Sequence, residues 1–327
     1  MTVRVNKQPF NIREKLSELE RPIGLKGHDL MGAETLQDAR DLVSAGRKNL
    51  IINGRFDFWQ RGTSFTTSVY NADRWNQALS GGTATVSRQS FATGQTEVPG
   101  NPVYYLRQSC SVGNGNCGIN QPIEDVRTGA GGPMTVSFWA KGTNPPGYGY
   151  WAIQLWQRFG TGGSPSGNVA NDKELTVTAN WKKYSFTYEL DSVSGKTLGT
   201  DNNSRVDFII RQHASDNDTG AWELNIANVQ VEFGRNATEF EHRSYGEELA
   251  LCQRYYEVNA NTQYTATGYH QSYIRSGMQF LVQKRTTPNV VVTNAVNSAG
   301  SSLSLTISPN PVGFNFSQNS VATSYGV

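Results

Sequence analysis

The sequence is poor in charged residues, and the charge it carries is nearly balanced. Asp, Glu, Lys and Arg make up 17% of the 327 residues, against about 25% in soluble domains. Lys and Arg number 29, Asp and Glu 27, which leaves a formal net charge of +2. A nucleic-acid backbone or an anionic membrane surface attracts proteins with a concentrated positive field, so we predict neither as a partner.

Long apolar runs are also missing. No run approaches the roughly 20 residues of a membrane helix, so we predict no membrane insertion. The N-terminal stretch MTVRVNKQPFNIREKLSEL lacks the apolar core of a secretory signal, and we expect the chain to fold in a cytosol. The three cysteines, Cys110, Cys117 and Cys252, are too few for a disulfide framework, so reduced thiols are expected.

Motifs for catalysis and cofactor binding are absent or fail in context. The four histidines lie far apart without paired spacing, there is no G-x-S-x-G elbow, and no repeat of about 20–50 residues marks a solenoid enzyme. The stretch GNGNCG matches a dinucleotide motif, but Pro122 follows it and no helical period does, so we predict a hairpin turn flanked by Cys110 and Cys117. We therefore predict no enzyme and no cofactor.

What is abundant is aromatic and turn-forming residues. Aromatics make up 11% of the chain, which supplies enough bulky apolar surface for a core and excludes general disorder. The 33 glycines, together with many Asn, Ser and Thr, favour strands joined by polar turns. The composition predicts a folded, mainly β protein.

Residues 1–48 differ from the rest in being helix-like and charge-rich. Ile12, Leu16, Leu19 and Ile23 follow the seam spacing of a coiled coil, and a second amphipathic helix is expected over residues 35–46. Helices this short are marginal alone, so we predict that they pack on sister chains or a larger assembly. A frayed extension is the alternative.

Residues 49–245 alternate apolar and polar positions between turn clusters, which predicts an antiparallel jelly-roll β-sandwich. The clearest expected strands are residues 50–53, 84–89, 103–110, 135–141, 151–159, 182–190, 205–212 and 222–233. In the last of these the apolar set changes parity, which predicts a β-bulge near Ala227 and Asn228.

Residues 246–327 are predicted to hold a short linking helix and a small C-terminal β-domain. The helix begins at Gly246 and buries Cys252 as a small apolar residue. Strands are expected at residues 278–284, 290–293, 303–307 and 312–316. So few large apolar groups make a thin core, and such a domain usually needs neighbours.

Several segments resemble those of one family. These are NLIINGRFDFWQRGTSF (residues 49–65), YNADRW (70–75), LNIANVQVEFG (224–234) and ATEFEHRSYGEELALCQRYYE (237–257), preceded by the opening FNIREKLSELERPIGLKG. In this order they resemble tailed-bacteriophage tail-fibre and related virion-fibre proteins. The resemblance is specific from about residue 10 to 257 and general beyond it.

The resemblance implies a structural fibre of a phage virion, assembled in the host cytoplasm, that binds host-surface carbohydrate during adsorption. It implies a homotrimer whose N-terminus docks on baseplate, tail or capsid proteins and whose middle is similar to a carbohydrate-binding module. Tail and head locations both stay open. The alternatives are a decoration fibre with little ligand binding and a polysaccharide-degrading enzyme.

A ligand face follows from strand alternation. The residues expected in the core are Val136, Phe138 and Ala140 in the first of three strands, Trp151, Ile153, Leu155 and Phe159 in the second, and Val206, Phe208 and Ile210 in the third. Opposite them lie Trp139, Trp156, Arg158, Asp207 and Arg211, which suit a saccharide whose C–H face stacks on indoles while its hydroxyls bond to charged groups. Coverage of both indoles by a trimer interface or a loop is the alternative.

A metal site is only weakly indicated. In the carbohydrate-binding modules that this sandwich resembles, a carboxylate after an N-G-x-F motif joins an acidic residue of the final strand around calcium. Asp57 fits the first position, but the final strand offers Asn225, Ala227 and Asn228. Calcium prefers six to eight oxygens, several of them charged, so we predict no metal.

Overall fold

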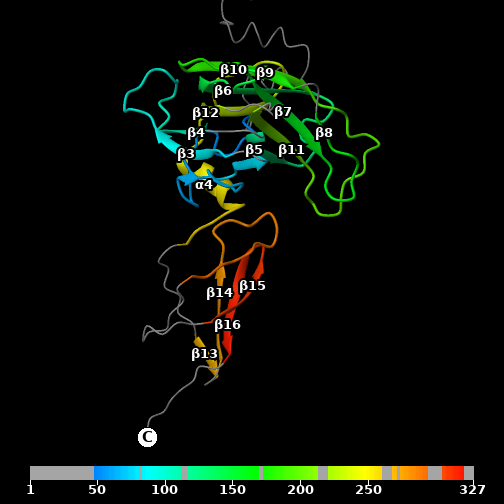
Figure 1. Ribbon diagram of the computed structural model, residues 1–327. Helices are drawn as coiled ribbons and strands as arrows, with labels where there is room; N and C mark the ends of the chain where they lie inside the picture. The colour runs from blue at the N-terminus through cyan, green and yellow to red at the C-terminus, as the bar shows by residue number, and fades with distance from the viewer. Residues whose placement is uncertain are drawn as a thin grey trace, which may run out of the picture.

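The computed structural model describes residues 48–80, 83–111, 116–168, 172–212, 220–259, 267–270, 273–293 and 304–319. These residues form a β-sandwich, a helix beneath it and a narrow C-terminal sheet that extends away from the sandwich (Figure 1). The two helices expected within residues 1–48 lie outside the described residues, which begin at Lys48. Among the described residues, no helix has the length and apolar character needed to cross a membrane.

The sandwich consists of two six-stranded antiparallel sheets. The first sheet has the order β1 (Ser64–Phe65), β3 (Thr85–Ser90), β4 (Tyr104–Cys110), β12 (Trp222–Phe233), β6 (Pro133–Thr143) and β10 (Lys182–Glu189). The second sheet has the order β2 (Asn76–Ser80), β5 (Asn116–Glu124), β11 (Arg205–Gln212), β7 (Trp151–Arg158) and β8 (Gly167–Asn168), with β9 (Lys173–Leu175) also on β7. This arrangement confirms the predicted mainly β, antiparallel jelly-roll class.

The core lies between the two sheets and is built by the predicted alternation. Every second side chain of β7, namely Trp151, Ile153 and Leu155, is fully buried. Phe138 of β6 meets Phe208 of β11 across the core, with ring centroids 6.4 Å apart. Burial of such side chains, at about 1.5–3 kcal/mol each, is the main force that holds the sheets together.

The predicted bulge in β12 is confirmed. The pairing register with β6 shifts between Ala227 and Gln230, and Asn228 has a φ of 49°, which asparagine tolerates better than most residues. Val229 here donates its N–H to the carbonyl of Gly54, where a Cβ would stand 2.2 Å from the Val229 oxygen. Only glycine fits this approach, so the bulge both restores the core parity of β12 and seats the 53–56 turn.

Other expectations about the sandwich strands were wrong. Residues 50–53 are not a strand, although Leu50 donates to the Val231 carbonyl, and β2 and β5 were not predicted. Cys110 ends β4 in the first sheet while Cys117 lies in β5 of the second, so the segment between them connects two sheets and the expected hairpin is wrong. Both thiols are buried in the core.

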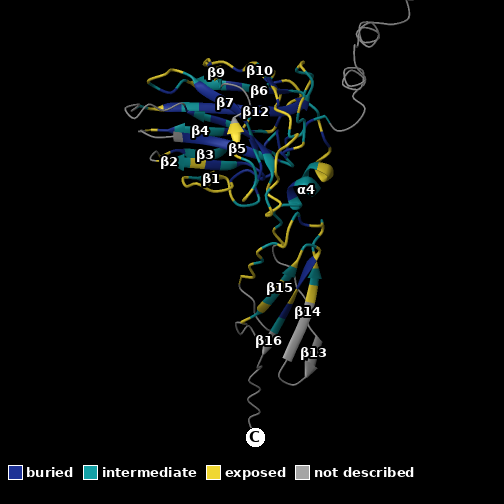
Figure 2. Ribbon diagram, turned by 90° about the vertical axis from the view of Figure 1, so that its right-hand side faces the viewer, coloured by how far each residue is buried: buried dark blue, intermediate teal, exposed yellow. Residues whose placement is uncertain are grey.

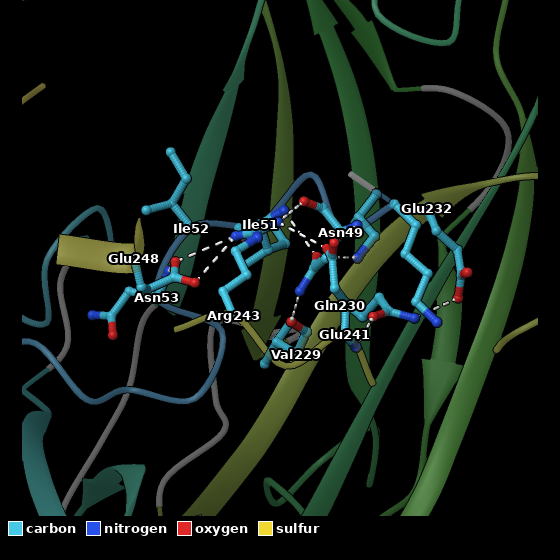
Figure 3. A network of polar contacts seen from close by, with 12 residues as sticks. Asn49, Ile51, Ile52, Asn53, Val229, Gln230, Glu232, Glu241, Arg243 and Glu248 are labelled. Atoms are coloured by element: carbon cyan, nitrogen blue, oxygen red, sulfur yellow. Dashed lines mark hydrogen bonds and ion pairs between the residues drawn. The ribbon is translucent and has the colours of Figure 1, made fainter. Parts of the chain in front are cut away.

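A buried polar network joins the two ends of the sandwich sequence (Figure 3). Arg243, whose side chain is 3% exposed, donates to the carbonyls of Asn49 and Ile51 and pairs with Glu241 and Glu248 at 3.2 Å. The Asn49 side chain in turn donates to the Val229 carbonyl and accepts from the backbone of Ile51. The entry segment, β12 and the following helix are therefore fixed to one another.

Helix α4 (Tyr245–Gln253) starts close to the predicted position. Ser244 is its N-cap and accepts from the Glu247 N–H, and two glutamates occupy the first turn, where the helix dipole favours them. Cys252 is 1% exposed, as predicted, and its burial raises the pKa of the thiol far above its ordinary value. The helix packs on the sandwich through Glu248, which accepts from the Asn53 N–H.

The C-terminal sheet has the order β13 (Thr267–His270), β14 (Tyr273–Gln279), β16 (Gly313–Asn319) and β15 (Thr306–Asn310). The expected strand at residues 290–293 is absent, and the one at 278–284 ends at Gln279 because residues 280–290 turn back toward α4. Strand β15 alternates exposed and partly buried residues, unlike the dark interior of the sandwich (Figure 2). The domain boundary at residue 246 stays a prediction.

Ionic contacts connect this C-terminal part to the sandwich. Lys284, 5% exposed, donates to the Gln253 carbonyl and to Glu257. Glu124, at the end of β5, pairs with Arg285 at 3.3 Å and with Arg254 at 3.2 Å. Partly buried charges attract each other more strongly than exposed ones, so these ion pairs stabilise the contact between the C-terminal part and the sandwich.

Candidate functional site

A groove of about 370 Å³ crosses the outer face of the second sheet. Residues from four adjacent strands, β2, β5, β11 and β7, line it, so the groove runs across the strands. In β7 and β11, strand alternation places the side chains that line the groove on the face opposite the core. The most prominent are Trp156, Arg158, Arg205, Asp207 and Arg211.

The groove exists because the middle of this face carries small side chains. Ala78 of β2 is paired with Gly118 of β5, and Gly118 is paired with Arg211 of β11. A Cβ on Gly118 would stand 2.8 Å from the Cβ of Arg211. Because Gly118 has no side chain, the Arg211 side chain fits beside it and the groove is deeper at this point.

One end of the groove is formed by an indole and two arginines around a buried carboxylate. Asp207, whose side chain is 3% exposed, accepts from Nε of Arg205 at 2.8 Å through one oxygen and from Nε of Arg158 through the other. The guanidinium carbon of Arg158 lies over the Trp156 ring, 4.6 Å from its centroid. Because the buried Asp207 accepts from both arginines, it orients the two guanidinium groups.

The other end is formed by a second polar triad. Arg211 donates from Nε to the Gln154 side chain at 3.1 Å and from an Nη atom to Asp172 at 3.2 Å. The amide of Gln154 donates to the other oxygen of Asp172 at 2.7 Å. Ile209, between the two ends, supplies apolar surface. The groove therefore combines apolar surface with hydrogen-bonding groups that are already oriented.

Four of the five residues predicted for the ligand face gather here, and Trp139 does not. Trp139 belongs to β6 in the first sheet, where it packs against a cluster made by Val98, Tyr105, Trp181 and Ala227. The expectation that Trp139 and Trp156 share one face is wrong, because β6 and β7 belong to opposite sheets. The groove offers one indole instead of two.

The β2 and β5 side of the groove was not predicted from the sequence. Gly118 and Asn120 lie in a strand that was not predicted, and Ala78 in another. Arg205 follows the alternation of β11, and that pattern was a sufficient signal to include it with Asp207. The small residues carried no signal of their own.

Asp57 and Asn225, which were considered for calcium, bind other side chains. Asp57 lies 3.7 Å from Nε of Arg55, and burial raises the pKa of Asp57 above its ordinary value despite the opposing charges of Arg55 and His242. Asn225 of β12 instead bonds to Arg107 and Glu223. Within the described ranges, no group of three or more His, Cys, Asp or Glu residues is arranged to hold a metal ion.

No protein-family model matches the chain, and no curated protein matches it. Among solved structures, the enzymatically active domain of tailspike protein 4 from bacteriophage CBA120 is 15% identical, over 57% of this chain and 21% of that one, with a TM-score of 0.37. The family 11 carbohydrate-binding module from Clostridium thermocellum is 15% identical, over 54% of this chain and 97% of the module, with a TM-score of 0.31. The CBM22-1 xylan-binding domain from Paenibacillus barcinonensis is 12% identical, over 59% and 99%, with a TM-score of 0.31.

Proposed function

We propose that this protein is a bacteriophage virion fibre that binds host-surface carbohydrate in the groove of its second sheet. The observation that carries the proposal is the combination, in one groove, of the Trp156 indole with the oriented groups of Arg158, Asp207 and Arg211. A sugar ring places its C–H face on an indole and bonds its hydroxyls to charged or amide groups. The groove presents both kinds of surface side by side.

We propose binding and not hydrolysis. Glycoside hydrolysis uses two carboxylates about 5–10 Å apart, one of which must donate a proton. Of the described residues at the groove, two carry a carboxylate, Asp207 in its lining and Asp172 at its other end. Each oxygen of Asp207 accepts from a guanidinium, and Asp172 accepts from Gln154 and Arg211. A carboxylate engaged in this way orients its neighbours and is poorly placed to act as an acid. Release of reducing ends from host polysaccharide would contradict this part of the proposal.

A single site of this kind binds weakly, and a fibre compensates by number. One stacked ring and a few charge-assisted hydrogen bonds correspond to a millimolar dissociation constant, about 4 kcal/mol. Three copies on a trimeric fibre, and many fibres on a particle, raise the effective affinity without new contacts. Reversible single contacts with strong total adhesion suit the first step of adsorption.

The trimer is supported by the C-terminal part of the chain. Leu281, Val291 and Val312 are each more than half exposed, and the buried apolar side chains among the described residues of the C-terminal sheet are Phe314 and Phe316. Apolar surface of this kind is costly in a monomer and is covered when copies associate. Light scattering should give three subunits per particle, and a mass of one subunit over a wide concentration range would overturn the trimer.

Attachment to the virion is proposed for residues 1–48, on the resemblance of their sequence to fibre attachment regions. Deleting them should leave a folded sandwich, because the core cluster that the structure describes runs from Ile51 to Val231. The truncated protein should no longer join particles that are assembled in its presence. Incorporation of the truncated chain at the normal level would refute the assignment.

The binding proposal is tested with the full chain and polysaccharide extracted from host cells. Trp156→Ala should abolish binding in affinity electrophoresis while the free energy of unfolding changes by no more than about 1 kcal/mol, as expected of a surface position. Trp139→Ala is the matched control, since it removes an indole from the opposite sheet. Unchanged binding by the Trp156 variant would contradict the proposal, and a blank result for the parent protein would favour a decoration fibre without a ligand.

A further inference from the structure

The polar groups of the groove are unequally charged. Three arginines, Arg158, Arg205 and Arg211, line it with side chains that are 26–32% exposed. Arg211 is neutralised by Asp172 at 3.2 Å. Among the described residues, Arg158 and Arg205 form ion pairs with Asp207 only, so two positive charges share one carboxylate at their end of the groove. Glu124, the cross-strand partner of Arg205, is instead bound by Arg254 and Arg285.

The arrangement of these two arginines is specific. Arg205 and Arg158 are direct cross-strand partners of β11 and β7, where two like charges side by side are normally unfavourable. The buried Asp207 binds both through their Nε atoms. The Nη atoms of both guanidinium groups take no part in this contact.

Most of those Nη donors are unused. Arg205 donates from one Nη atom to the Asn203 carbonyl at 3.1 Å. Within the part of the chain that the structure describes, neither Nη atom of Arg158 has a hydrogen-bond partner. A guanidinium fork of fixed orientation matches the two oxygens of a carboxylate or the oxygens of a phosphate.

We infer that the ligand of the groove is an acidic saccharide, whose carboxylate or phosphate group is bound by the Nη atoms of Arg158 and Arg205 while a neighbouring ring lies against Trp156. This inference rests on the proposed function and narrows its ligand class. An anion at this point completes the charge balance that Asp207 begins. A neutral sugar leaves the excess positive charge uncompensated.

The test is an array that pairs acidic oligosaccharides with their neutral parents, probed with the full chain. One arm carries uronic-acid oligomers and their carboxyl-reduced forms, and the other carries phosphorylated sugars and the same sugars without phosphate. We expect at least tenfold tighter binding of one acidic member than of its neutral parent. The arm that binds identifies the anion, and binding should weaken as salt rises from about 0.05 to 0.5 M.

Variants separate this inference from the proposed function. Arg158→Gln should lose at least tenfold in affinity for the acidic ligand, and Arg158→Lys, which keeps the charge without the fork, should lose affinity too. Arg88→Gln, in β3 of the first sheet, is the control and should bind normally. Urea unfolding of each variant verifies that it is folded.

The outcomes are distinct. Equal affinity for neutral and acidic members, lost in Trp156→Ala but kept in Arg158→Gln, would overturn the acidic ligand and leave carbohydrate binding intact. No binding to any member of the array would overturn both. Tighter acidic binding that Arg88→Gln removes and Arg158→Gln does not would place the anion site elsewhere and refute the inference.

Discussion

Replacing Arg243 with Met should destabilise the sandwich by about 3–5 kcal/mol, the cost of breaking a buried ion pair by removing one partner. The Arg243 side chain is 3% exposed and its guanidinium serves four acceptors at once, two carbonyls and two carboxylates (Figure 3). Methionine fills much of the volume but donates to none of them. The stability is therefore lost because hydrogen bonds and ion pairs are removed, and not because packing changes.

The magnitude follows from what the substitution leaves behind. The carbonyls of Asn49 and Ile51 lose a charged donor, and an unsatisfied buried polar group costs about 1–3 kcal/mol. Glu241 and Glu248 keep 21% and 15% of their side-chain surface, so water compensates them in part and they add less. Against a typical total stability of about 5–15 kcal/mol, the change is large.

Urea unfolding followed by tryptophan fluorescence measures this loss. The midpoint should fall while the slope of the transition is unchanged, because the surface exposed on unfolding is the same. Arg127→Met is the control, since Arg127 pairs with Asp125 on the surface and its loss should leave the midpoint in place. A loss below about 1 kcal/mol for Arg243→Met would refute the view that this network fixes the entry segment to α4.

Three further predictions concern the junction, the groove floor and the core thiols. Burial alone would raise the pKa of Glu124, but hydrogen bonds from Arg254 and Tyr255 and the arginine charges hold this pKa below the ordinary 4.5. The ionised Glu124 therefore stabilises the fold fully above pH 4.5, and this stabilisation is lost as the pH falls through the lowered pKa. Glu124→Gln should therefore weaken the contact with Arg285 at pH 7, and calorimetry should show that the acid-dependent part of the loss has gone. Gly118→Val should displace Arg211 and reduce ligand affinity, measured by titration calorimetry, with wild-type affinity as the contradicting result. Burial and then the charge of Cys110 raise the pKa of Cys117 to about 11, so a disulfide reagent at pH 8 should modify Cys117 only after unfolding.

Alternation in the sequence predicted which side chains point away from the core, but not to which of the two sheets each strand belongs. Trp139 and Trp156 both alternate with buried residues, and the period of two is the same on either sheet. In the sandwich the consecutive strands β6 and β7 fall in opposite sheets, so their outward faces point apart. The pairing of β7 with β11 arises from contacts about 50 residues apart, as in Asp207 opposite Trp156, and local pattern does not encode it.

Strand β5 escaped prediction for a related reason. Its sequence NCGINQPIE contains a glycine and a proline, and an inward position is occupied by the polar Gln121. The Gln121 side chain bonds to the distant backbone of Ile52, donating to its carbonyl and accepting from its N–H, both at 2.8 Å. Gln121 interrupts the inward apolar positions Cys117, Ile119 and Ile123, which weakens the apolar pattern of the strand. The β12 bulge was predictable because its apolar parity change is local.

The central claim, that a saccharide occupies the groove of the second sheet, is tested most directly by a crystal structure of the full chain with a bound acidic oligosaccharide. The account predicts a sugar ring against Trp156 and an anionic group within hydrogen-bond distance of the Nη atoms of Arg158 and Arg205. Density for the sugar on the outer face of the first sheet near Trp139, or on the C-terminal sheet with the groove empty, would contradict it.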